Sequence, residues 1–207
     1  MTTRTPRRSR SDGERSRRAI LAVAARLATV EGLNGLSIGR LAEETGMSKS
    51  GLFAHFGSKE ELQLATVAAA EEVFQEDVVA PALGVAEGRV RLELLCEGFL
   101  SHVERGVFPG GCFFASAVAE LDTRPGRVRD RVAAIAGGWG DLMVAAVREA
   151  QGRGEIDAAT DPGQLAFELN AALAYGNSMF VLDRDPAVLA TARRAIADRL
   201  ERAAPAV

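Results

Sequence analysis

Residues 37–59 read SIGRLAEETGMSKSGLFAHFGSK, and this stretch decides the fold of the N-terminal part of the chain. Ser37 and Ser48 are suitable N-caps for two short helices, and Gly46 between them permits a tight turn. Two short helices joined in this way form a helix-turn-helix, whose second helix can enter a DNA groove. The apolar residues that can form a small core shared with the preceding helix are Ile38, Leu41, Met47, Leu52 and Phe56.

The second of these helices leaves small, polar and aromatic side chains on its outward face. Lys49 can reach a phosphate or a guanine edge, while Phe53 and Ala54 can contact thymine methyl groups. His55 can donate to a phosphate, and Lys59 combines its charge with another helix N-terminus. The alternative is a pair of amphipathic helices that merely pack in a bundle. The residues predicted to contact DNA are Ser37, Lys49, Ser50, Gly51, Phe53, Ala54, His55 and Lys59.

The charge distribution separates the two parts of the 207-residue chain. Residues 1–59 carry 11 basic and 5 acidic side chains, whereas the rest carries 14 and 23, which gives the net charge of −3. The basic end is therefore the plausible polyanion-binding end. Residues 1–14 lack an apolar period and predict a disordered basic arm, either a solvated tail or a segment that touches the DNA backbone.

Apolar residues recur at helical spacing along the remaining sequence, which predicts an all-α fold without strands. Asp161-Pro162 and Asp185-Pro186 each combine an N-cap with proline at the first helical position. We expect a helix-turn-helix domain at 15–60 and a helical effector-binding and dimerisation domain at 61–207. The expected helices, nine in number, are at about 15–31, 37–45, 48–56, 58–79 (stopped near Pro81), 90–105, 113–121, 128–151, 162–182 and 186–203.

The composition points to a reducing, cytoplasmic setting. Cys96 and Cys112 cannot form a disulfide framework and are not part of a CxxC motif; they are either buried inert thiols or a redox pair. No secretory signal is recognisable at the basic start. The apolar segment 165–182 contains Glu168 and two asparagines, which favours a helix buried in protein over a membrane span.

Residues 17–65 closely resemble the N-terminal domain of the TetR family of bacterial transcriptional repressors. The matching features are the alanine-rich first helix, the IxxLAxxxGMSKxxLxxHF core at 38–56 and the Ser-Lys-Glu-Glu-Leu run at 58–62. The resemblance implies a homodimer that binds a palindromic operator and is released when an effector binds the helical body. It also implies that Phe53 stands where many members have Tyr, and Gly51 where Thr or Ser is frequent. Both differences remove inherited side-chain contacts.

The body offers candidates for both of these functions. A pocket between helices would be apolar with a few polar groups, which suits an apolar or aromatic effector. Its candidate residues are Phe99, His102, Cys112, Phe113, Trp139, Met143, Phe167 and Asn170, each of which is otherwise ordinary core. The stripes predicted to form the dimer interface are Leu165, Leu169, Ala172, Leu173, Gly176, Phe180, Leu189, Ala192, Ile196 and Leu200, which a monomer would use as core.

Three classes of function fit these patterns to different degrees. A ligand-responsive repressor fits best, and a DNA-binding regulator without a small-molecule effector is the alternative. An enzyme is disfavoured because the sequence has no phosphate loop, GxSxG elbow or HExxH motif. His102 with Glu97 or Glu104 is not a convincing metal site, so neither a metal nor a cofactor is predicted.

Overall fold

The computed structural model describes residues 7–85 and 87–205, and every regular element in this part of the chain is a helix. The elements are α1 (Arg7–Glu31), α2 (Ile38–Thr45), α3 (Lys49–Phe56), α4 (Lys59–Phe74), the π-helix η1 (Gln75–Val79), α5 (Ala80–Val85), α6 (Arg89–Glu104), α7 (Phe113–Leu121), α8 (Arg127–Gly152), α9 (Pro162–Asp183) and α10 (Pro186–Arg202). Because α4, η1 and α5 follow one another without a break, the described residues form nine helical rods. The expected all-α fold is confirmed.

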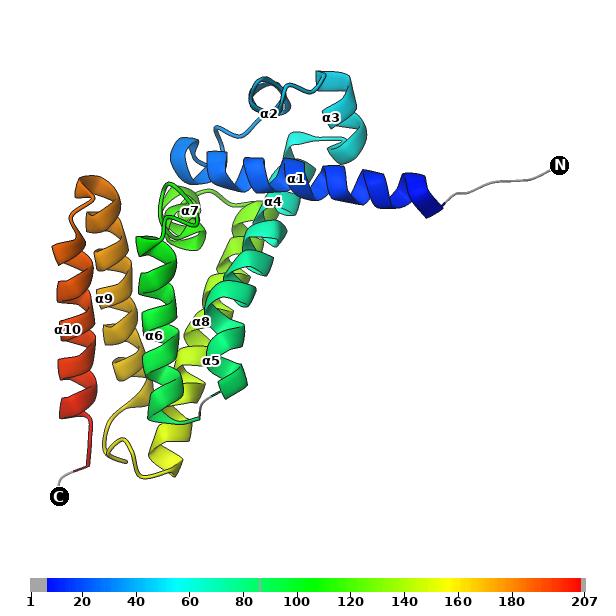
Figure 1. The fold of residues 1–207 in the computed structure, drawn as a ribbon. Coiled ribbons are helices and arrows are strands. Elements are labelled where there is room, and N and C mark those ends of the chain that lie inside the picture. The colour runs from blue at the N-terminus through cyan, green and yellow to red at the C-terminus, as the bar shows by residue number, and fades with distance from the viewer. Residues whose placement is uncertain (1–6, 86, 206–207) are drawn as a thin grey trace.

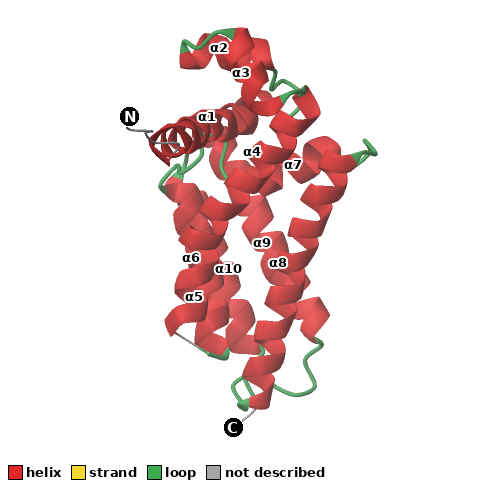
Figure 2. Ribbon diagram, turned by 90° about the vertical axis from the view of Figure 1, so that its right-hand side faces the viewer, coloured by secondary structure: helices red, strands yellow, loops and turns green. Residues whose placement is uncertain are grey.

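The molecule has a small head on an elongated body (Figure 1). The head holds α2 and α3 above α1, and the body aligns α4 to α6 with α8, α9 and α10. Turned by 90°, the head still sits at one end, with α4 running from it into the body (Figure 2). The head core includes Ile20 and Leu41 and also Leu62 of α4. The expected boundary at residues 60 and 61 therefore falls inside a continuous helix that belongs to both units.

Two helices differ from the sequence-based expectation. α1 begins at Arg7, so residues 7–14 are helical and the predicted disordered arm is wrong for them; residues 1–6 lie outside the described part. The helix expected to stop near Pro81 instead continues to Val85 through η1. In this π turn the N–H of Ala80 donates to the carbonyl of Gln75, five residues back. The wider turn lies directly before Pro81, where an α-helix would lose a donor and meet the proline ring.

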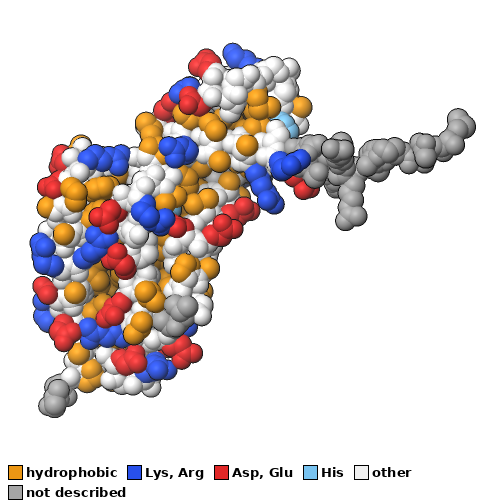
Figure 3. Space-filling view, viewed as in Figure 1, with side chains coloured by type: hydrophobic (Ala, Val, Ile, Leu, Met, Phe, Trp, Pro, Cys, Tyr) orange, Lys and Arg blue, Asp and Glu red, His pale blue; other side chains and the backbone are white. Residues whose placement is uncertain are grey.

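The body surface mixes charges of both signs, although the body sequence is acidic. On the face shown in Figure 3, acidic and basic side chains alternate over the long helices. Many are paired, as in Arg193 with Glu97 at 2.8 Å and with Glu104 at 2.7 Å. Pairing of this kind balances charge locally, while the excess of acidic side chains in the body remains. Within the described residues, no helix has the length and apolar character needed to cross a membrane.

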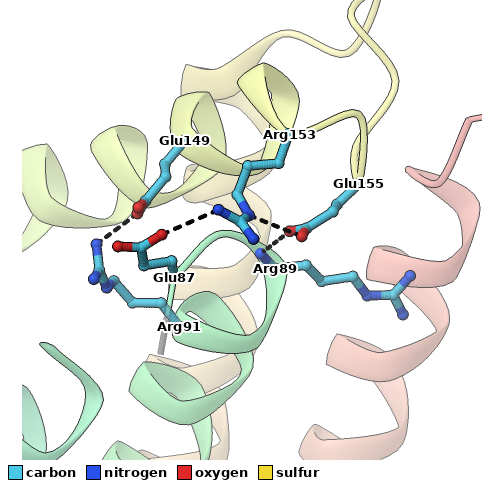
Figure 4. Close-up of polar contacts among 6 residues, drawn as sticks. All are labelled: Glu87, Arg89, Arg91, Glu149, Arg153 and Glu155. Atoms are coloured by element: carbon cyan, nitrogen blue, oxygen red, sulfur yellow. Dashed lines mark hydrogen bonds and ion pairs between the residues drawn. The ribbon is translucent and has the colours of Figure 1, made fainter. Parts of the chain in front are cut away.

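Ion pairs tie the lower end of α6 to the end of α8, at the base of the body (Figure 4). Arg91 contacts Glu149 at 2.5 Å, and Arg153 contacts Glu87 at 3.0 Å. Glu155 accepts hydrogen bonds from the Arg153 side chain at 3.0 Å and from the backbone N–H of Arg89 at 2.7 Å. We call these six residues the base network; it fixes the end of the body remote from the head.

Candidate nucleic-acid interface and body cavity

Side-chain caps fix each turn of the helix-turn-helix. The hydroxyls of Ser37, Ser48 and Ser58 each accept a hydrogen bond of 3.1 Å from the backbone N–H three residues later. Gly46 ends α2 with φ of 67°, a left-handed conformation that glycine adopts at little cost. Leu41, Leu52 and Phe56 are buried in the head core, while Ile38 and Met47 pack on its edge. The small core expected from the sequence is therefore present.

The outward face of α3 carries the residues predicted to contact DNA. Lys49, Ser50 and Ala54 are exposed, while Gly51 and His55 are half-buried. Phe53 is 57% exposed, which is unusual for a large aromatic ring. The helix therefore presents a small-residue surface with a single apolar projection.

Both lysines of the chain lie near helix N-termini of the head. A Cβ atom built on Gly39 would lie 3.6 Å from Nζ of Lys49, so this ammonium group sits over the first turn of α2. Nζ of Lys59 donates to the carbonyl of Asn34 at 2.5 Å, just before the same helix. Two cations beside the exposed N–H groups of a helix start form an environment that favours a phosphate.

Arg17 of α1 contacts the C-terminal end of α3 and was not identified from the sequence. Its Nη1 donates to the carbonyl of His55 at 2.7 Å, and its guanidinium lies 4.6 Å from the ring centroid of Phe56. These contacts satisfy a carbonyl at the C-terminal end of α3 and hold the helix against α1. No spacing signal links residue 17 with residue 55, because the contact depends on the packing of α1 under α3.

The head meets the body through a carboxylate that binds backbone amides. Glu120 of α7 accepts from the N–H of Leu33 at 2.7 Å, from the N–H of Asn34 at 2.8 Å and from the Asn34 side chain at 2.6 Å. A few residues earlier, the N–H of Gly110 donates to the hydroxyl of Thr29 at 3.1 Å. We call these contacts the α1–α7 junction.

The loop before α7 is also fixed to α9. The side-chain oxygen of Asn177, which is buried, accepts from the N–H of Cys112 at 2.8 Å. Arg184 at the end of α9 donates to the carbonyl of Pro109. The loop therefore contacts the head on one side and α9 on the other. A movement of α7 would change both sets of contacts.

The body has a cavity of about 560 Å³ between α4, α6, α7, α8 and α9, and it is partly open to solvent, because Val118, Ala174 and Ser178 in its lining are exposed. Of the predicted pocket residues, Phe99, Cys112, Trp139 and Asn170 line it. Nε1 of Trp139 donates to Oδ1 of Asn170 at 2.6 Å, which joins α8 to α9 across the cavity. Phe74 was not predicted, yet it meets Trp139 edge to face with ring centroids 5.3 Å apart. Its position in a long apolar helix gave no signal of a cavity.

The other four predicted pocket residues lie elsewhere. Met143 is buried in the body core. Phe113 is buried against Phe114, with ring centroids 5.3 Å apart. Phe167 is 69% exposed on the outer side of α9. His102 is buried behind the ring of Phe74, with centroids 6.0 Å apart, and does not reach the cavity. Helical spacing predicted that these four residues lie near the centre of the body, but it does not indicate which side of each helix faces the cavity.

His102 contacts the carboxylate of Asp77 in η1 and does not line the cavity. Its Nδ1 lies 2.6 Å from Asp77, and Asp77 also accepts from Arg105 at 2.7 Å. Burial lowers the pKa of His102, although the neighbouring carboxylate opposes this. Partial burial raises the pKa of Asp77 less than hydrogen bonds from Arg105 and His102 lower it, so the net shift is downward. The pair is therefore a neutral imidazole that donates to a carboxylate.

The two cysteines are buried and reduced. Burial raises the pKa of Cys96 to about 12 and also raises the pKa of Cys112. Both are therefore thiols rather than reactive thiolates at neutral pH, which favours the inert alternative. Among the described residues, no group of three or more His, Cys, Asp or Glu side chains could hold a metal ion.

Most of the residues predicted to form the dimer interface are buried within the protomer. Except for Ala172 and Gly176, these residues belong to the body core, because α9 and α10 pack on each other and on the remaining helices. The outer face of α9 carries Phe167, Tyr175 and Leu182, which are 69%, 69% and 72% exposed. A shallow groove of about 420 Å³, with four alanines among its ten lining residues, lies beside Tyr175 between α9 and α10. Ala172, Gly176 and Ala192 of the predicted stripes line this groove, so the stripes lie mostly in the core and partly at this surface.

A helix-turn-helix head on a helical body is an architecture that DNA-binding transcriptional regulators use. Residues 20–66 match the family "Bacterial regulatory proteins, tetR family", and residues 88–196 match "Tetracyclin repressor-like, C-terminal domain". The chain belongs to the TetR family of bacterial transcriptional regulators, a family of DNA-binding proteins rather than of enzymes.

Solved structures share this fold over nearly the whole chain. A TetR transcriptional regulator from Chloroflexus aurantiacus J-10-FL is 27% identical, with a TM-score of 0.85 over 93% of this chain and 97% of that one. AibR, in complex with isovaleryl coenzyme A and operator DNA, is 26% identical, with a TM-score of 0.70 over 86% and 95%. A regulator from Saccharomonospora viridis in complex with choline is 23% identical, with a TM-score of 0.74 over 91% and 96%. None of the curated proteins matches the sequence.

Proposed function

We propose that this regulator is a homodimeric, cytoplasmic repressor that leaves its operator when a small molecule fills the body cavity. The observation that carries the proposal is the junction of Glu120 with the head, because α7 bears Glu120 and also lines the cavity. AibR, which is similar in sequence and fold, has been solved with both an acyl-coenzyme A and operator DNA. This supports a body that responds to a ligand and a head that binds DNA.

The head would read DNA with α3 in the major groove. Lys49 and Lys59 neutralise phosphates at the start of α2, while Ser50, Gly51 and Ala54 allow the backbone close to the bases. Phe53 supplies an apolar contact to a thymine methyl group. Ser37 and His55 complete the set of backbone contacts.

Binding to the DNA upstream of the protein's own gene, measured over a range of salt concentrations, tests this assignment. We expect Lys49→Ala and Lys59→Ala each to weaken binding and to reduce the salt slope by about 1 for each phosphate that is no longer neutralised. Arg148→Ala is the matched control, because Arg148 is an exposed cation on α8, remote from the head. If both lysine variants retain the wild-type slope, the contact assignment is wrong.

The dimer would form through the outer faces of α9 and α10. Exposed Phe167, Tyr175 and Leu182 and the alanine-lined groove supply apolar surface that a partner copy can cover. Tyr175→Glu should give a monomer by light scattering, whereas Leu83→Glu on α5, on the opposite side of the body, should leave the dimer intact. A dimeric Tyr175→Glu protein would contradict this interface.

A regulator without a small-molecule effector remains the alternative. It predicts that no compound changes operator affinity, even when the compound is shown to occupy the cavity. The cavity and its shared helix favour the ligand-responsive function, because a site of about 560 Å³ is within the range of small-molecule pockets.

A further inference from the structure

The cavity is lined by four aromatic rings together with aliphatic side chains. Phe74 meets Phe114 edge to face at 6.0 Å and Trp139 at 5.3 Å, and Phe99 lies 6.3 Å from Trp139. Rings in such arrangements leave faces and edges for a further aromatic or alicyclic group. The lining of the cavity therefore favours a ligand with a ring system.

No charged side chain lines the cavity among the described residues. The titratable group behind Phe74 is His102, which burial keeps in the neutral form. The thiol of Cys112 is also neutral, because burial raises its pKa. A charge buried against this lining would lose part of its hydration and find no opposite charge among the lining side chains, an unfavourable exchange.

Asn170 is the polar group that can recognise a ligand. Since the indole N–H of Trp139 is a donor only, the contacting atom of Asn170 must be its oxygen, and Nδ2 lies on the other side of the amide. No acceptor for Nδ2 is found in the described part of the chain, although Asn170 lines the cavity and is half-buried. The other polar lining group, the hydroxyl of Ser178, donates to the carbonyl of Ala174 at 3.0 Å and is exposed.

We propose that the effector is an uncharged ring compound with a hydrogen-bond acceptor, such as a ketone oxygen, that binds Nδ2 of Asn170. The inference rests on the proposed function, because it names the ligand class of the same cavity. Asn170 thus determines specificity: Trp139 fixes the orientation of its amide, and the ligand oxygen satisfies the remaining donor.

Calorimetric titration with four naphthalene probes of similar shape tests the inference. These probes are 2-acetylnaphthalene, 2-ethylnaphthalene, 2-naphthoate and (2-naphthylmethyl)trimethylammonium. We expect the ketone to bind about fivefold more tightly than the ethyl compound, the equivalent of one neutral hydrogen bond. Both ions should bind at least about 100-fold more weakly than the ketone. Binding of either ion as tightly as the ketone, or no binding of the ketone, would overturn the proposal.

Two substitutions locate the recognition on Asn170. Asn170→Leu removes the donor and should abolish the preference for the ketone over 2-ethylnaphthalene while both still bind. Asn170→Asp keeps an acceptor for Trp139 but adds a negative charge, so it should favour the trimethylammonium probe over the ketone. Emission of Trp139, the only tryptophan of the chain, reports whether each variant keeps the wild-type environment. An unchanged ketone preference in well-folded variants contradicts the role of Asn170.

Operator binding without any probe separates this inference from the proposed function. If the protein binds operator DNA with the expected salt slope but none of the probes follows the predicted order, the ligand class alone is wrong. If DNA binding itself fails, the proposed function is wrong, whatever the probes do.

Discussion

The base network and the α1–α7 junction both hold helices together by polar contacts, but they are built differently. The base network consists mainly of overlapping Arg–Glu side-chain pairs, several of them exposed, with one further bond from the backbone N–H of Arg89 to Glu155 (Figure 4). The junction uses one carboxylate on backbone amides, and a loop whose backbone touches α1 directly. Exposed ion pairs contribute little individually, whereas at the junction three donors, two of them backbone amides, depend on one carboxylate.

This difference indicates which end of the body can respond to a ligand. At the base, loss of one pair leaves the others in place, so the end of α8 stays fixed. At the junction, Glu120 has no substitute in the described structure, and its helix lines the cavity. A ligand that displaces α7 therefore changes the contact with the head while the base stays fixed, which is the asymmetry that a switch requires.

The largest expected effect is at Gly110, where the loop touches α1. A Cβ atom there would lie 1.9 Å from the carbonyl oxygen of Thr29, so Gly110→Ala must push α1 and the loop apart. We expect a loss of about 2–3 kcal/mol in the free energy of unfolding, measured by urea denaturation. Gly137→Ala on α8 is the control: apart from its chain neighbours and the backbone of its own helix, no described atom lies within 4 Å of its Cβ, and alanine should stabilise this helix by up to about 1 kcal/mol.

Glu120→Gln should have the next largest effect, since it turns one of the two acceptor atoms into a donor. We expect a loss of about 1.5–3 kcal/mol in unfolding free energy, as for hydrogen bonds to a charged group. Hydrogen exchange of the Leu33 and Asn34 amides should become faster, while amides at the base keep their rates. Unchanged exchange at residues 33 and 34 would show that the carboxylate does not hold the head.

The head was largely predictable from sequence, because its signals are local. The serine caps, Gly46 and the apolar spacing of Leu41, Leu52 and Phe56 lie within one short stretch, and each acts on its neighbours. Contacts that join distant segments were not predictable. Glu120 meets residues 33 and 34 across more than 80 positions, and no periodicity links them.

The body shows the limit of helical periodicity in another way. The stripes on α9 and α10 were identified as apolar, but apolar spacing does not distinguish a face buried in the protomer from one that a partner covers. Leu169 and Leu189 are buried in the protomer core, whereas Tyr175 and Leu182 point outward. The same ambiguity placed Phe167 and Met143 in the pocket.

His102 and Asp77 predict a pH dependence of stability that belongs to the body alone. Burial holds the pKa of His102 in the folded state below 6.5. The unfolded state therefore binds more protons than the folded state as the pH drops below about 6.5, and the free energy of unfolding decreases. The pKa of Asp77 is also lowered, so its stabilisation is present above 3.8 and is lost only as pH falls through the folded value. His102→Asn should flatten the decline between pH 6.5 and 5, by at most about 1.4 kcal/mol per pH unit. An equally steep decline in the variant would contradict burial of a neutral imidazole.

The smallest expected effect is at the base, where Glu155→Gln matches Glu120→Gln in chemistry. Glu155 also accepts from a backbone amide, at 2.7 Å, but Arg153 can still pair with Glu87, and Arg91 with Glu149. We therefore expect a smaller shift in the urea midpoint than Glu120→Gln gives, with unchanged operator affinity and unchanged exchange at residues 33 and 34. A larger shift from Glu155→Gln would mean that the base, rather than the junction, is the sensitive contact. In that case α8, rather than α7, would be the helix that couples ligand binding to the head.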